Sequence, residues 1–163
     1  MQKPPRQRNQ RLFDWPLIFR AYLFLGPIEA FAAMSAFFFT LHRGGWRPGA
    51  SLETADILYR EATASCLSAI VCLQMVAVFL CRSERASLFH AAPGRNPLLF
   101  AGVLIEALFL GLIVYSPWGN AIFLTAPIPG ATWLFILPFA LLMLCAEEAR
   151  KWCIRTRDKR QTR

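Results

Sequence analysis

The stretch "NPLLFAGVLIEALFLGLIVYSPWG", residues Asn96 to Gly119, decides the fold class. About twenty predominantly apolar residues are enough for an α-helix to cross the ~30 Å hydrocarbon core of a membrane, and this stretch meets that length. Glu106 is its single acidic or basic residue. A charge near the bilayer centre costs roughly 2.5 to 3.5 kcal/mol on insertion scales, so we expect Glu106 to have either a partner or a function.

The composition is that of a membrane protein. Hydrophobic residues make up 56% and aromatic residues 13% of the 163 residues, and the mean hydropathy is +0.39. The net charge is +8, but the basic residues gather in both tails and at the ends of apolar runs, which favours membrane topology over nucleic-acid binding. The N-terminal "MQKPPRQRNQRLFDWP" has no short apolar core with a cleavage site, so no signal peptide is predicted.

Four apolar segments are long enough to span a bilayer, at about 17–41, 62–81, 97–116 and 131–146. The fourth is the shortest, and Pro138 can kink it. Trp133 at one end, with Arg150 and Lys151 beyond the other, can extend its reach by anchoring and snorkelling. The sequence predicts an all-α membrane protein, a bundle of four transmembrane helices forming one domain over residues 1–163. The connections "HRGGWRPG" and "SPWGNAIFLTAPIPG" are expected to be loops.

The orientation follows from the Lys and Arg residues of the flanks. They number five in the N-terminal segment through Arg20, three in the loop after the second helix and seven in the C-terminal tail, against three and none in the other two loops. Because the number of spans is even, both termini share one side. The positive-inside rule predicts that both termini are cytoplasmic, in a multi-pass protein of the plasma (inner) membrane.

Cysteine and histidine chemistry is not indicated. The cysteines lack CxxC spacing, so neither a disulfide framework nor a zinc site is predicted for Cys66, Cys72, Cys81, Cys145 and Cys153. His42 and His90 are far apart in sequence, and neither is assigned a metal. No nucleophile arrangement and no GxxxxGK[ST] phosphate loop is present.

Three polar residues lie deep inside the predicted spans. By helical rise, Glu106 is roughly 14 Å from the cytoplasmic start of its helix, Glu29 roughly 18 Å and Gln74 roughly 10 Å from the cytoplasmic ends of theirs. Carboxylate and amide oxygens can replace the water around a cation, so Gln74 and Glu106, with Glu29 as a weaker candidate, could contribute to a cation site. The alternative is that each is a neutral side chain hydrogen-bonded to a neighbouring helix.

Other features fit a plain structural role. Small residues form faces that predict close helix contacts, at Ala30, Ala32, Ala33 and Ala36 and at Ala64, Ser65, Ser68 and Ala69. "CRSERASLF", Cys81 to Phe89, is typical of a basic cluster at the membrane interface. "AEEARKW", Ala146 to Trp152, is typical of a helix end that enters the cytoplasm.

Taken together, these segments resemble the last four transmembrane helices of P-type cation-transporting ATPases of the calcium-pump and sodium/potassium-pump type. "MQKPPR" is similar to the loop before that family's seventh helix, and "CRSERASLF" to the turn after the eighth. "NPLLFAGVLIEALFLGLIVYSP" resembles the ninth helix, and "TAPIPGATWLF…EEARKW" the tenth. The order and spacing of the motifs, over nearly the whole chain, carry the resemblance.

The resemblance implies roles for single residues. In the family, the eighth helix offers a carboxylate or amide to the transported ion, and the matching position is Gln74. One turn later some members add a polar ligand, where this chain has Ala77. In sodium/potassium pumps a glutamate of the ninth helix is tied to an extra ion site, and the matching position is Glu106. The transported cation, whether calcium, sodium or potassium, stays open, and no cofactor is expected in this chain.

The resemblance also implies a partner. The family forms a phosphoenzyme on a DKTG motif, which this sequence lacks, so no ATPase activity is expected from this chain alone. The leading hypothesis is a membrane-domain fragment or split subunit that joins the remaining N-terminal part of a P-type pump within the lipid bilayer. Two alternatives stay open: a free-standing helical bundle that assembles with or regulates another membrane protein, and a small ion conductor using Glu29 and Glu106.

Overall fold

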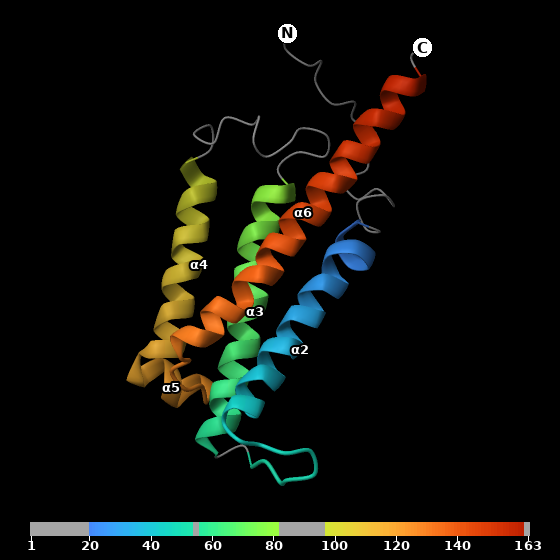
Figure 1. Cartoon of the computed structure of the whole chain (residues 1–163). Coiled ribbons are helices and arrows are strands. Elements are labelled where there is room, and N and C mark those ends of the chain that lie inside the picture. Colours follow the sequence, from blue (N-terminus) through green and yellow to red (C-terminus); the bar gives the residue numbers. More distant parts are fainter. Residues whose placement is uncertain (1–19, 54–55, 82–96, 162–163) are drawn as a thin grey trace.

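The computed structural model describes residues 20–53, 56–81 and 97–161, and every regular element in those ranges is a helix (Figure 1). Four helices are long and apolar enough to cross a membrane: Leu23–Arg43, Ile57–Cys81, Pro97–Tyr115 and Gly130–Arg157. Many large apolar side chains on their outer faces are exposed, as lipid-facing side chains would be. The prediction of an all-α protein with four spanning helices is confirmed.

The first span changes helix type at a proline. A short π-helical segment, η1 (Arg20–Leu25), precedes α2 (Gly26–Arg43), and Pro27 lies at the start of α2. Proline has no N–H to donate, and its ring excludes the carbonyl one turn earlier, so the regular helical ladder cannot run through this point. The wider π-helical turn accommodates the interruption. The change of helix type therefore coincides with Gly26 and Pro27.

The second span begins earlier than predicted. Helix α3 runs over Ile57–Cys81, and the backbone N–H of Arg60 donates to the carbonyl of Asp56 at 3.1 Å. The predicted start at residue 62 was wrong because it followed the beginning of the apolar run. Hydropathy marks the part of a helix that suits lipid, whereas the backbone ladder also includes the polar turn in front of it.

The connection after α4 (Pro97–Tyr115) contains a helix that was predicted as loop. Helix α5 (Pro117–Phe123) starts with Ser116 as its N-cap, whose hydroxyl accepts a 2.9 Å hydrogen bond from the N–H of Gly119. A serine cap followed by proline at the first position is a helix-start signal. α5 folds back on α4, and the absence of a side chain at Gly119 permits this, because a Cβ there would overlap the Leu112 carbonyl and Ile113.

The last helix is twice the predicted length. α6 covers Gly130–Gln161, 32 residues, and continues through Pro138 and past the predicted end at residue 146. The polar continuation is rich in Glu, Arg and Lys, which favour helix. Ion pairs three residues apart support it, Glu147 with Arg150 at 2.7 Å and Glu148 with Lys151 at 3.7 Å.

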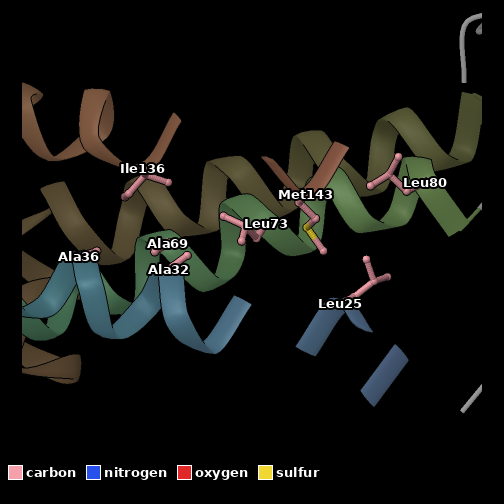
Figure 2. Packing of buried hydrophobic residues seen from close by; sticks show 8 residues of the cluster. All are labelled: Leu25, Ala32, Ala36, Ala69, Leu73, Leu80, Ile136 and Met143. Atoms are coloured by element: carbon pink, nitrogen blue, oxygen red, sulfur yellow. The ribbon is translucent and has the colours of Figure 1, made fainter. Parts of the chain in front are cut away.

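The core lies between α2, α3 and α6. α2 and α3 make the most extensive contact, and α6 contacts both of them and crosses α3 diagonally (Figure 1). Figure 2 shows the buried cluster that these helices share: Leu25, Ala32, Ala36, Ala69, Leu73, Leu80, Ile136 and Met143. The predicted small-residue faces of α2 and α3 are buried, except Ala30, which is exposed. α4 stands to one side, against α3 and α5.

Candidate functional site

Two of the three polar residues that the sequence suggested for a cation site, Glu29 and Gln74, lie together. Glu29 lies in the first turn of α2, and its side chain shares a hydrogen bond with that of Gln74 on α3. Pro27 sets the start of α2, which continues directly from η1. Glu29 is half-buried, whereas Gln74 is exposed. The pair therefore lies at the edge of the α2–α3 interface, open to whatever surrounds the bundle.

Glu106 has a different neighbour. It is half-buried on α4 and lies near Cys72 of α3. Successive residues of an α-helix are rotated by about 100°, so Cys72 and Gln74 lie about 200° apart around α3. Glu106 and the Glu29–Gln74 pair are consequently on different sides of α3. The sequence predicts similar depths for the three residues, but helix packing separates Glu106 from the Glu29–Gln74 pair.

The Glu29–Gln74 pair and Glu106 differ in the ligands that they can offer to a cation. Glu29 and Gln74 together offer carboxylate and amide oxygens, the ligand types that hard cations prefer. Within the described residues, no group of three or more His, Cys, Asp and Glu side chains could hold a metal ion. A cation at either place would need further oxygen ligands from water or from another chain.

A polar contact that sequence reasoning missed joins the same two helices. The Thr40 hydroxyl donates to Ser65 Oγ at 2.8 Å, and the Ser65 hydroxyl donates to the carbonyl of Glu61 at 2.7 Å. Both side chains are buried, Thr40 being 4% exposed and Ser65 0%. Hydroxyl side chains beside the small-residue faces are the sequence feature from which this bond could have been predicted. Close-packed membrane helices often hydrogen-bond through Ser and Thr.

The "AEEARKW" segment is buried to an extent that the sequence did not indicate. Glu147 is 0% exposed and Lys151 1%. Both side-chain oxygens of Glu147 accept from Arg150, at 2.7 and 2.8 Å, and Lys151 Nζ donates to the Leu80 carbonyl at 3.1 Å. The expectation that Lys151 snorkels into water is wrong, because the end of α3 covers it. Arg150 is the more accessible of the two cations.

Other sequence predictions fall outside the described residues. They concern "MQKPPR", His90 and all of "CRSERASLF" except Cys81. Ala77, where some members of the resembled family have a polar ligand, is half-buried on α3. The cysteines are free thiols, with Cys66 and Cys72 half-buried and Cys81, Cys145 and Cys153 exposed.

Comparison with known proteins covers nearly the whole chain. The family described as "Cation transporting ATPase, C-terminus" matches residues 1–153. The chain is 27% identical to sodium/potassium-transporting ATPase subunit alpha-4 of Homo sapiens over 180 aligned residues, which include 95% of this chain and 17% of that protein.

Two further relatives match similar shares of this chain and of their own length. The corresponding alpha-4 subunit of Rattus norvegicus is 25% identical, covering 96% of this chain and 18% of the relative. The alpha-2 subunit of Gallus gallus is 23% identical, covering 95% and 18%. The chain thus spans less than a fifth of the length of these curated relatives.

Proposed function

The chain belongs to the family of cation-transporting ATPase C-terminal regions, and from this premise we propose that it works as the C-terminal membrane part of a P-type cation pump. In this role it packs against the remaining membrane helices and lends polar side chains to the ion pathway. ATP hydrolysis would belong to the rest of the pump. The multi-pass helices place the chain in a membrane, and we propose the plasma membrane with both termini on the cytoplasmic side.

One observation carries this proposal: the hydrogen-bonded Glu29–Gln74 pair on the open edge of the α2–α3 interface. An ionisable group within a span is expensive and usually faces a partner or an ion pathway. Glu29 has a partner in Gln74, but the exposed Gln74 leaves the pair incomplete on one side. Further helices of a pump on that side would supply the missing oxygen ligands and exclude lipid.

Glu106 has a separate part in the proposal. It lies on a different side of α3 from the Glu29–Gln74 pair, so it would serve a second, peripheral ion site. The relatives described above are sodium/potassium-transporting ATPase subunits. We therefore propose a monovalent cation as the transported ion rather than calcium.

Coexpression tests the proposal. The 163-residue chain, produced with the remaining N-terminal part of a matching pump, should copurify with it in mild detergent and restore ATPase activity that depends on sodium or potassium. The N-terminal part alone is the control. If the two parts copurify but no cation stimulates ATP hydrolysis, the role in the ion pathway is refuted, while a purely structural association would remain.

The size of the native polypeptide separates a split subunit from a piece of a longer pump. An antibody against the tail "RTRDKRQTR" can be used on membranes of the source cell. A band at 18.5 kDa would indicate a separate subunit. A much larger band would indicate that this region is continuous with the rest of the pump.

A further inference from the structure

A polar cavity lies at the end of the bundle where α2 ends and α3 and α6 begin. Its volume is about 170 Å³, many times the ~10–15 Å³ that one water needs. Its lining residues are Thr40, Arg43, Gly44, Glu61, Pro129 and Thr132. The cavity is separate from the Glu29–Gln74 pair and from Glu106, so no part of the proposed ion pathway accounts for it.

One lining side chain lacks a hydrogen-bond partner. Thr132 is 0% exposed, and its hydroxyl has no partner among the residues that the structure describes. An unpaired buried hydroxyl costs roughly 1–3 kcal/mol, so a bound group that pairs with it would be stabilised. Thr132 is in the first turn of α6, where the helix dipole favours an anion, and its own N–H donates to the Pro129 carbonyl at 3.0 Å. These features together indicate a ligand with oxygen acceptors.

The charges of the lining make the ligand more specific. Arg43 and Glu61 line the same cavity, and Arg43 also lies over the Phe39 ring, 5.8 Å from its centroid. A simple anion would be repelled by Glu61, and a simple cation by Arg43. A ligand that carries a phosphate and an ammonium group would satisfy both, because guanidinium binds phosphate oxygens in a bidentate way and a carboxylate binds ammonium.

The depth of the cavity indicates where such a ligand would come from. Arg43 is the last residue of the first span, and Gly130 is the first residue of the fourth. The cavity between them is therefore at the level of the lipid headgroups. We propose that it binds a phosphoethanolamine group, with the phosphate at Arg43, Thr132 and the start of α6, and the ammonium at Glu61. The source would be a phosphatidylethanolamine headgroup or free phosphoethanolamine.

Lipid retention by the full 163-residue chain tests this site. The chain is reconstituted in nanodiscs with equal amounts of phosphatidylethanolamine and phosphatidylglycerol, transferred to detergent, and its bound lipids are counted by native mass spectrometry. Phosphatidylethanolamine should be retained at least fivefold over phosphatidylglycerol. Arg43→Gln should lower its retention at least fivefold, and Glu61→Gln should abolish the preference between the lipids, because only the ammonium group meets Glu61.

Matched controls are available in the loop between α2 and α3. Arg47 and Glu53 are exposed and do not line the cavity, so Arg47→Gln and Glu53→Gln should stay within twofold of the unmodified chain. Thr132→Ser keeps the hydroxyl and should retain lipid, whereas Thr132→Val should not. Circular dichroism checks the helix content of each variant. If Arg43→Gln fails to fold, the lost lipid preference of Glu61→Gln and the lost retention of Thr132→Val, compared with Thr132→Ser, carry the test.

Two outcomes support the site and identify the source of its ligand. Displacement of the retained lipid by millimolar phosphoethanolamine in solution would assign a free ligand, and resistance to displacement would assign the membrane lipid. Equal retention of the two lipids by the unmodified chain would overturn the proposal. Unchanged retention in folded Arg43→Gln and Glu61→Gln would do so as well. In both of these cases the cavity holds water.

Discussion

Lys151 Nζ lies 3.1 Å from the carbonyl oxygen of Leu80, a residue 71 positions earlier in the chain. A charged ammonium group donates a stronger hydrogen bond than a neutral donor does. Lys151 of α6 brings such a donor to the end of α3 and also lies 3.7 Å from Glu148. This contact ties the end of one span to the polar extension of another.

Replacing Lys151 by Met should destabilise the bundle. The variant keeps the apolar stem and loses a charge-assisted hydrogen bond of roughly 1.5–3 kcal/mol. The free energy of unfolding in detergent micelles, followed by circular dichroism, measures the loss. Arg157→Met is the control, because Arg157 is exposed on the same helix, and it should change the unfolding free energy by less than about 0.5 kcal/mol. Equal losses in the two variants would show that the contact does not stabilise the bundle.

Replacing Thr40 by Val should weaken the contact between α2 and α3. It removes the 2.8 Å hydrogen bond to Ser65 with almost no change in shape, and such bonds between membrane helices contribute roughly 0.5–1.5 kcal/mol. Thr63→Val is the matched control, since the Thr63 hydroxyl bonds only carbonyls of its own helix among the contacts that the structure describes. A double-mutant cycle with Ser65→Ala measures the coupling, and a coupling energy near zero would contradict the prediction.

Replacing Gly119 by Ala should displace α5. The new methyl group would overlap the Leu112 carbonyl and come within 2.7 Å of Ile113 Cα, and such overpacking costs roughly 1–3 kcal/mol. Gly102→Ala is the control, because a Cβ there meets nothing within 4 Å, and it should be neutral or stabilising. Thermal unfolding of both variants is the measurement. A Gly119→Ala chain as stable as Gly102→Ala would mean that α5 tolerates a shift away from α4.

Substitutions at the Glu29–Gln74 pair and at Glu106 should have different effects in the assembled pump. Glu29→Gln and Gln74→Leu should act on the same ion site, so the double variant should weaken cation activation of ATPase activity little more than the stronger single variant. Glu106→Gln should shift the activation curve independently, and its effect should add to either of the others. Cation titrations of ATPase activity give the curves. An unchanged curve for Glu106→Gln would leave Glu106 as a hydrogen-bonded packing residue.

The four spans could be predicted because lipid imposes a simple requirement on sequence. Every backbone group in the hydrocarbon core must be paired internally, so a long apolar run has to be a helix. The ends of the helices could not be predicted from hydropathy in the same way. α6 continues for fifteen residues past the predicted end at residue 146, because Glu147 and Arg150 stabilise a helix that is no longer apolar. α5 was missed because its cap, Ser116, lies in a segment rich in Gly and Pro.

The sequence by itself determined the number of spans, the small-residue seam between α2 and α3, and the family resemblance. The depth of Glu29, Gln74 and Glu106 in the membrane stays a prediction from the rise per residue of a helix. The tertiary structure alone decided that Glu29 meets Gln74 and that Glu106 meets neither. Rotation about a helix axis is set by side-chain packing between helices, and a sequence pattern of near-uniform hydrophobicity does not specify which face meets which neighbour.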